Sequence, residues 1–206
     1  MVCQHQKNLK EMKLNNKYYI IRHGEAQSNV KDIVSCYPEK IKNPLTKHGK
    51  EMIKESAQKL KTMTMQAGKN IDLIFCSPLL RTKQTAEIIS KILKVKVKHD
   101  KRLTEINFGI FNFSGIKNIF GFFKKEEDRI NAKPPKGESY AEIIKRMWNF
   151  FVDVNKKYKR KTILIVSHEG PLLFLEGKVM GLSLKETIKK FPNKKRIHKG
   201  EIRELN

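Results

Sequence analysis

Short apolar segments that alternate with longer segments of helical periodicity are the feature that most constrains the fold of this chain. Residues 17–22, 71–77 and 162–168 have the length and the β-branched and aromatic content of buried strands. Residues 95–98 alternate valine and lysine, as a half-exposed strand does, and residues 200–205 suit an edge strand. Because helical segments separate these strands, the order predicts a three-layer α/β sandwich with a mostly parallel central sheet.

The helices are predicted from apolar residues that recur at intervals of three and four positions. Three side chains of the type that caps helix N-termini precede such segments, namely Thr46, Ser77 and Ser139. Residues 103–137 show no helical period, so we predict an irregular, phenylalanine-rich segment there. Its part from about residue 106 to 137 is predicted to form a short cap on the domain.

The chain is strongly basic, with 44 Lys and Arg against 21 Asp and Glu and a formal net charge of +23 over 206 residues. Such a field attracts anions, among them nucleic acid, acidic membranes and phosphorylated metabolites. The lysine runs at 156–161 and 189–199 are more typical of solvated faces than of nucleic-acid patches. The length predicts a single domain over residues 17–206, preceded by a loose basic leader over residues 1–16.

The three cysteines, Cys3, Cys36 and Cys76, are scattered and lack the spacing of a metal or redox site. A sparse and odd count is typical of a reducing compartment, and the N-terminal residues lack the apolar segment of a signal peptide. No apolar run approaches the ~18 residues that a membrane span needs. These observations predict a cytoplasmic protein with no membrane partner.

Polar clusters directly follow two of the apolar strands. The first strand ends in Arg22-His23-Gly24 and another ends in Ser167-His168-Glu169-Gly170, while Arg81 lies in the first turn of the helix after 71–77. Ligands of open α/β sheets bind beside the carboxyl ends of the strands, and helix N-termini there favour anions. Two histidines and two arginines at one sheet edge therefore predict a site for a phosphoryl group.

Six blocks of the sequence, in order, resemble those of one protein family. They are RHGEAQSN (22–29), NPLTKHGKEMI (43–53), SPLLRTKQTAEII (77–89), RLTEINFG (102–109), PPKGES (134–139) and ILIVSHEG (163–170). Over residues 17–205 the chain resembles the histidine phosphatase superfamily, also called the phosphoglycerate mutase-like family. The resemblance implies the phosphoglycerate mutase-like version of the three-layer α/β fold.

The resemblance also implies the roles of individual residues. It makes His23 the nucleophile that becomes phosphohistidine, Arg22 and Arg81 the phosphate clamp, His168 a second histidine on the phosphoryl group, and Glu105 the proton donor. Asn29 is expected to touch the phosphate or to hold the loop.

Elementary chemistry agrees with these roles. A neutral imidazole is a competent nucleophile, and neighbouring arginines lower its pKa. Arginines and helix N–H groups can neutralise the phosphoryl oxygens, so we expect no metal and no cofactor.

The leading hypothesis is a metal-independent, histidine acid phosphatase-type phosphomonoesterase that hydrolyses a small phosphorylated metabolite. One alternative is a cofactor-dependent phosphoglycerate mutase; the short segment between Glu105 and residues 137–139 favours hydrolysis instead. A second alternative is a basic module that binds a phospho-ligand or nucleic acid with little turnover. Two departures from the family pattern, Asn112-Phe113 and Glu169, bear on the substrate rather than on catalysis.

Overall fold

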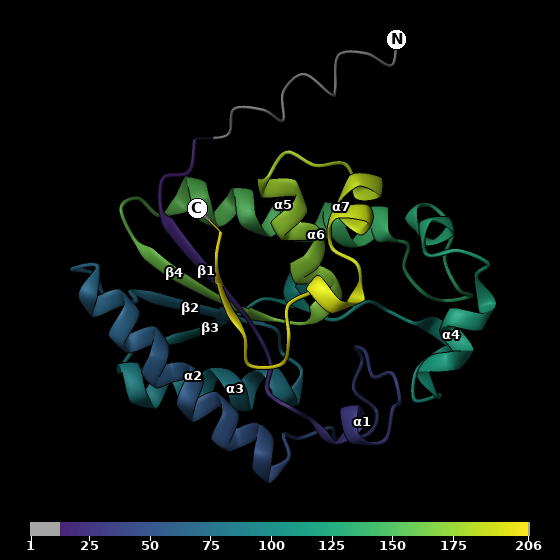
Figure 1. Ribbon diagram of the computed structural model, residues 1–206, viewed down its shortest axis with the longest axis horizontal. Coiled ribbons are helices and arrows are strands. Elements are labelled where there is room, and N and C mark those ends of the chain that lie inside the picture. The colour runs from purple at the N-terminus through teal and green to yellow at the C-terminus, as the bar shows by residue number, and fades with distance from the viewer. Residues whose placement is uncertain (1–12, 206) are drawn as a thin grey trace.

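The computed structural model describes residues 13–205, and its centre is a five-stranded sheet with the order β3-β2-β4-β1-β5 (Figure 1). The strands are β1 (Lys17–Arg22), β2 (Leu73–Cys76), β3 (Val97–His99), β4 (Thr162–Ser167) and β5 (Ile202–Glu204). The first four run parallel, and β5 pairs with β1 in the antiparallel direction. The predicted α/β architecture with a mostly parallel sheet is confirmed.

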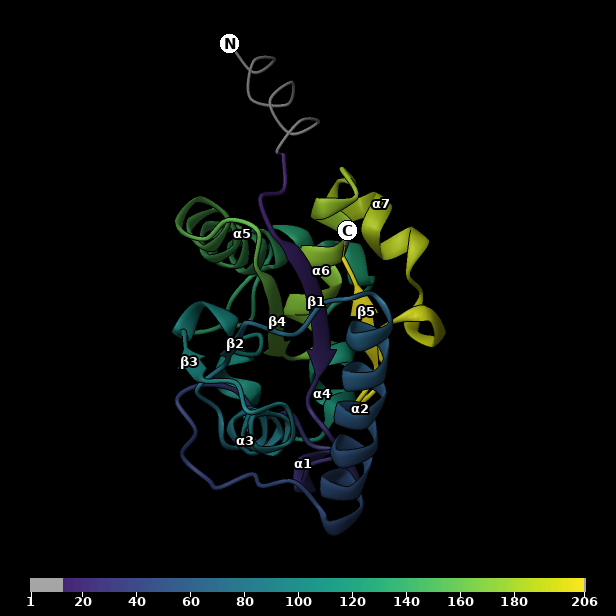
Figure 2. The ribbon, with the colours of Figure 1, turned by 90° about the vertical axis from the view of Figure 1, so that its left-hand side faces the viewer.

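Helices cover both faces of the sheet and complete the three layers (Figures 1 and 2). One layer consists of α2 (Lys47–Gln66) and α3 (Leu80–Leu93). The other consists of α5 (Tyr140–Lys157) and α6 (Glu169–Val179), with α7 (Leu184–Lys190) beside them.

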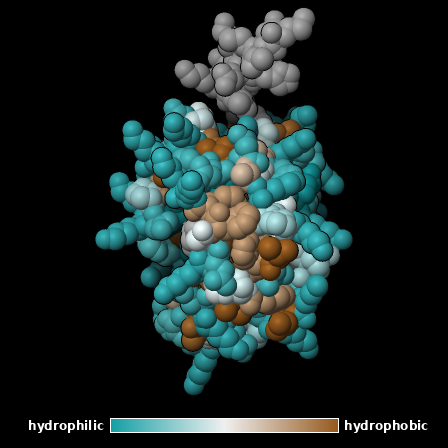
Figure 3. All heavy atoms as spheres, turned by 90° about the vertical axis from the view of Figure 1, so that its right-hand side faces the viewer, coloured by the Kyte–Doolittle hydropathy of each residue, from teal (hydrophilic) through white to brown (hydrophobic). Residues whose placement is uncertain are grey.

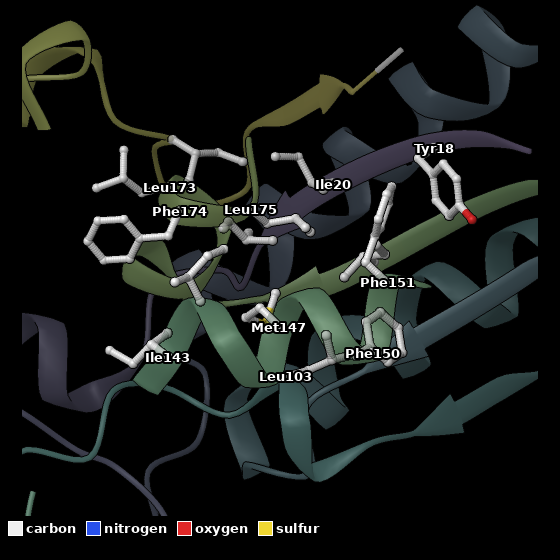
Figure 4. Close-up of a cluster of buried hydrophobic side chains, with 14 of the residues drawn as sticks. Tyr18, Ile20, Leu103, Ile143, Met147, Phe150, Phe151, Leu173, Phe174 and Leu175 are labelled. Carbon is white, nitrogen blue, oxygen red and sulfur yellow. The ribbon is translucent and has the colours of Figure 1, made fainter. Parts of the chain in front are cut away.

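The alternation of side chains along β1 divides the core into two parts. Tyr18 and Ile20 pack toward α5 and α6, whereas Tyr19 and Ile21 pack toward α2 and α3. Figure 4 shows the first of these clusters, in which Phe150 and Phe151 of α5 lie against the strands. Because both faces of β1 and β4 are covered, the carboxyl ends of these strands are held in place by the packed core.

The segment predicted to be irregular, residues 103–137, is partly helical. It contains α4 (Ile116–Phe122) and two short 3-10 helices (Gly109–Phe111 and Glu126–Ile130), and a third (Lys101–Leu103) ends at its start. The periodicity missed α4 because this helix has only seven residues, begins after Gly115 and contains Gly121. The start of α4 is held by the loop that follows α1 (Gln27–Val30), because the backbone carbonyl of Asp32 accepts a hydrogen bond from the N–H of Ile116 at 3.0 Å.

The predicted helix starts were right at two positions and wrong at the third. Thr46 accepts a hydrogen bond from the N–H of Gly49, and Ser139 accepts one from the N–H of Glu142. Ser77 is not an N-cap, because α3 begins three residues later, at Leu80. Its side chain contributes to the candidate site instead.

Most of the predicted basic leader, including Cys3, lies outside the described residues. Its last part contacts α5: the N–H of Asn15 donates to Oδ1 of Asn155 at 2.8 Å. Among the described residues, no helix has the length and apolar character needed to cross a membrane.

We expect Phe151→Ala to lower the free energy of unfolding by about 3–5 kcal/mol, because the ring is fully buried and lies 4.6 Å from that of Tyr18, measured between centroids. Urea denaturation of the two proteins measures this difference. Phe122→Ala is the control, since its side chain is 49% exposed and the same truncation removes much less buried surface. Equal losses for both variants would contradict the assignment of Phe151 to the core.

Candidate active site

The carboxyl ends of β1 and β4 bring together the two histidines predicted from the sequence. The N–H of His23 donates to the carbonyl of Ser167 at 3.1 Å, which extends the pairing of the two strands by one residue. The rings of His23 and His168 consequently lie edge to face, with centroids 5.1 Å apart. Arg22, Arg81 and Glu105 lie around the same point, so the structure gathers the predicted constellation.

Hydrogen bonds determine which nitrogen of His23 carries the lone pair. Nδ1 lies 2.7 Å from the carbonyl oxygen of Gly24, which can only accept, so Nδ1 carries the proton. Nε2 lies 3.1 Å from Nε of Arg81, which can only donate. Burial, with Arg81 and then Arg22, lowers the pKa of His23 well below its ordinary value. The ring is therefore neutral, and its lone pair is on Nε2.

Arg81 is buried in the first turn of α3 and is positioned by the loop after α1. Its Nη2 donates to the carbonyl of Ser35 at 2.9 Å, and its Nη1 lies 3.8 Å from the carboxylate of Glu39. Glu39 also accepts a hydrogen bond from the N–H of Leu80 at 2.9 Å, at the start of the helix. Sequence reasoning missed Ser35 and Glu39, because they lie in a loop without a recognisable pattern.

Arg22 is held by residues from two other parts of the chain. Its Nη1 donates to the carboxylate of Glu169 and to the carbonyl of Ile197, the latter at 3.2 Å. Its Nε is buried and has no hydrogen-bond partner among the described residues. Arg22 therefore keeps an unpaired donor in the same cavity wall as His23.

His168 is fully buried next to His23 and is not among the residues that line the cavity. Its Nε2 lies 2.9 Å from Oγ of Ser77, which explains why this serine does not cap α3. Its Nδ1 has no hydrogen-bond partner in the described part of the chain and lies 3.9 Å from Oε2 of Glu105. Burial, with Arg81 next, lowers the pKa of His168 well below its ordinary value, so this ring is also neutral.

Glu105 lies in an environment that favours its protonated form. Burial raises the pKa of Glu105, and Arg81 opposes this effect only in part. Its backbone is fixed by Arg146 of α5, which donates to the carbonyls of Arg102 at 2.6 Å and Glu105 at 3.1 Å. Arg146 is in turn held by Glu138, at 2.9 Å, so the PPKGES block supports the acid.

Two residues of the RHGEAQSN block have structural contacts that the sequence did not distinguish. Asn29 lines the cavity, and its Oδ1 accepts a hydrogen bond from the N–H of Ala26 at 2.9 Å, which holds the loop. Gly24 lies directly against α2. A Cβ at this position would lie 2.5 Å from the carbonyl oxygen of Gly49, so packing against α2 is what requires the glycine.

The cavity in front of His23 has a volume of about 130 Å³ and two further arginines in its wall. Arg196 donates through Nη2 to both carboxylate oxygens of Glu126, each at 2.7 Å. Arg129 lies over the ring of Tyr140, 4.6 Å from its centroid. Sequence reasoning missed both arginines, because one lies in an acidic run and the other in a lysine run.

Apolar side chains complete this cavity and continue to the surface beside α4. Those that line it include Ile33, Phe108, Ile116 and Leu173. On the face that carries α4, apolar side chains gather within a hydrophilic surround (Figure 3), and Phe122 of α4 is exposed. Residues 106–137 therefore supply one apolar wall of the cavity.

Within residues 13–205, no group of three or more His, Cys, Asp or Glu side chains is arranged to hold a metal ion. Cys36 and Cys76 are buried free thiols, and burial raises the pKa of Cys76 to about 12. The reaction without a metal remains a prediction from the residues of the site.

The sheet order and the two helical layers define the phosphoglycerate mutase-like class of α/β folds. The model of the histidine phosphatase superfamily (branch 1) matches residues 18–196, and the chain belongs to this superfamily. A crystal structure of the α-ribazole phosphatase from Shigella flexneri matches with a TM-score of 0.72 and 25% identity, covering 90% of this chain and 88% of the other.

Two curated relatives indicate the kinds of reaction found among similar chains. Phosphoserine phosphatase 1 of Hydrogenobacter thermophilus is 27% identical over 173 residues, covering 82% of this chain and 78% of the relative. "Probable phosphoglycerate mutase GpmB" of Photorhabdus laumondii is 28% identical over 169 residues, which cover 80% of this chain and 74% of the relative. The chain is accordingly an enzyme of phosphatase or mutase type.

We expect Glu105→Gln to stabilise the protein above pH 4.5, the ordinary pKa of a glutamate, because burial raises the pKa of Glu105. A raised pKa means that the folded state binds the proton more tightly than the unfolded state, so the wild type loses stability as the pH rises through the folded-state value. Urea denaturation of both proteins between pH 4 and pH 8 measures the difference.

Glu142→Gln should have the opposite effect, because Lys133 and then the N–H of Ser139 lower the pKa of Glu142. The wild type should therefore be the more stable of this pair above pH 4.5, and the gap should shrink as the pH falls. The same sign for both substitutions would argue against a protonated, buried Glu105.

Proposed function

We propose that this protein is a phosphomonoesterase that hydrolyses a small phosphorylated metabolite through a phosphohistidine at His23. The observation that carries the proposal is the 2.7 Å hydrogen bond between Nδ1 of His23 and the carbonyl of Gly24. It leaves the lone pair on Nε2, which is the nitrogen beside Arg81. A neutral imidazole in this tautomer, next to two arginines, is prepared to attack phosphorus.

In the first step, the phosphoryl group lies between Arg22 and Arg81, which neutralise its oxygens. Nε2 of His23 forms a bond to phosphorus while the bond from phosphorus to the ester oxygen breaks. The leaving oxygen takes a proton from Glu105, whose raised pKa keeps that proton available. The leaving group departs as an alcohol, and Glu105 is left as a carboxylate.

In the second step, water attacks the phosphohistidine. The carboxylate of Glu105 accepts a proton from the water, a new oxygen–phosphorus bond forms, and the bond from phosphorus to Nε2 breaks. The resemblance implies that His168 also contacts the phosphoryl group. Its Nδ1, which has no hydrogen-bond partner among the described residues, would have to reach a group bound to the neighbouring His23. The step returns neutral His23 and protonated Glu105, so the cycle needs no metal and no cofactor.

A phosphoglycerate mutase reaction is the second candidate, since one relative carries that name. The two functions differ in what receives the phosphoryl group, namely water or a second hydroxyl of the substrate. Release of inorganic phosphate from phosphorylated metabolites, measured in EDTA, supports hydrolysis. Conversion of one phosphoglycerate isomer to the other without phosphate release would overturn it. A cytoplasmic location remains a prediction from the cysteine content.

We expect His23→Ala to abolish phosphoryl transfer while the protein stays folded, because the variant lacks the nucleophilic nitrogen. Rapid quenching of the wild type should trap acid-labile, alkali-stable phosphate on His23. The control is His48→Ala, which removes an exposed histidine of α2 and should leave the rate unchanged. Normal turnover by His23→Ala would exclude the phosphohistidine mechanism.

The effect of Glu105→Gln should depend on the leaving group. An alkyl leaving group needs a proton, whereas a nitrophenolate hardly needs one, and general acid catalysis contributes about 10²–10⁴-fold. We expect a loss of this size in kcat/KM for alkyl phosphates and a much smaller loss for nitrophenyl phosphate. Equal losses on both substrates would move the acid role to another residue. Glu25 is poorly placed for that role, because it accepts a hydrogen bond from Thr46 at 2.8 Å.

A further inference from the structure

The cavity wall contains a row of side chains with alternating charge. Arg22 donates to the carboxylate of Glu169, and Oε1 of Glu169 lies 3.8 Å from Nη1 of Arg196. Arg196 in turn binds both oxygens of Glu126. All four side chains line the cavity in front of His23. A substrate therefore meets this row on one side while its phosphoryl group is bound.

Glu169 is the unusual member of the row, since glycine often follows the second histidine in the family that the sequence resembles. Its position is constrained by the next residue: a Cβ at Gly170 would lie 2.5 Å from Cδ1 of Ile106 and 3.5 Å from Oε1 of Glu105. The start of α6 is thus packed directly against the segment of the proton donor. The carboxylate of Glu169 consequently lies beside the region where the leaving group must sit.

The arginines of the row are already engaged by carboxylates of the protein. A carboxylate on the leaving group would have to displace Glu126 from Arg196, or Glu169 from Arg22, and would then lie close to the displaced group. Like charges at such separations cost several kcal/mol when they are poorly solvated. A hydroxyl group meets no such cost, because Oε1 of Glu169 has no hydrogen bond from the described residues and can accept one.

The charges that line the cavity lead to the same expectation. Four arginines and three glutamates line it, and Glu39 adds a further negative charge 3.8 Å from Arg81. With Glu105 protonated for its role as an acid, the lining and Glu39 together carry four positive and three negative charges. The two charges of a phosphate monoester already offset this excess of positive charge. A leaving group with its own negative charge would therefore add a charge that the lining does not neutralise.

We propose that Glu169 is a specificity-determining residue, which directs the enzyme to phosphomonoesters with an uncharged, hydroxyl-bearing leaving group and excludes those with a carboxylate there. This inference rests on the proposed function for the location of the phosphoryl group. It defines the substrate class more narrowly and disfavours phosphoglycerates as substrates.

Glycerol 3-phosphate and 3-phosphoglycerate test the inference, because they differ only by a hydroxymethyl group in place of a carboxylate. We expect the wild type to favour glycerol 3-phosphate by at least about tenfold in kcat/KM, the size of a modest charge penalty. Glu169→Gln keeps the size of the side chain and removes its charge, so it should reduce this ratio several-fold. Glu169→Gly should reduce it further.

The matched control is Glu55→Gln, which removes the same charge from an exposed position on α2. It changes the long-range field of the protein equally, and the substrate ratio should stay at the wild-type value. A ratio that shifts equally in this variant would assign the effect to net charge and overturn the role of Glu169. A wild-type preference for 3-phosphoglycerate would also overturn it.

Binding to His23→Ala, measured by calorimetry, separates this inference from the proposed function. The variant cannot form a phosphohistidine, yet its wall is intact, so it should bind glycerol 3-phosphate more tightly than 3-phosphoglycerate. If the variant shows this preference but the wild type hydrolyses neither compound, the proposed function is refuted and the inference is not. If the wild type hydrolyses phosphomonoesters but the variant binds both compounds equally well, or binds neither, the inference is refuted and the proposed function is not.

Discussion

The parallel pairing of β1 with β4 is the interaction on which the rest of the site depends. Its register places Arg22 opposite Ser167, and the N–H of His23 continues the ladder to the carbonyl of Ser167. A slip of one residue would turn Arg22 and His23 to the opposite faces of the sheet, because side chains alternate along a strand. The burial of Tyr18, Ile20, Ile163 and Ile165 on one face makes that slip costly.

The buried charges explain why the site needs so many supporting contacts. Burial and the neighbouring arginines both lower the pKa of His23, so the ring stays neutral beside two cations. Arg81 in turn needs acceptors, which the carbonyl of Ser35 and the carboxylate of Glu39 supply from one loop. These contacts hold Arg81 in the wall of the cavity, where its positive charge is available to a phosphoryl group.

Local patterns in the sequence were sufficient to predict the sheet, the main helices and the residues that gather at its edge. Strand ends and helix starts are local features, so Arg22, His23, Arg81 and His168 could be placed from apolar runs alone. Arg129 and Arg196 could not. Arg196 and Glu126 are 70 positions apart in the chain, and no local signal marks their contact. Ser77 was misassigned because the same side chain suits a helix N-cap and a histidine partner equally well.

The two sides of the cavity therefore have different origins. The reacting groups stand on the ends of packed strands, where the core allows little change without loss of stability. The opposite wall comes from the segment around residues 126–130 and from Arg196, which meet through hydrogen bonds between the side chains of Arg196 and Glu126. Glu169 joins the two, since its backbone follows His168 directly while its carboxylate belongs to the charged row. A substitution at this position can change what the wall accepts while the strands and the two histidines keep their positions.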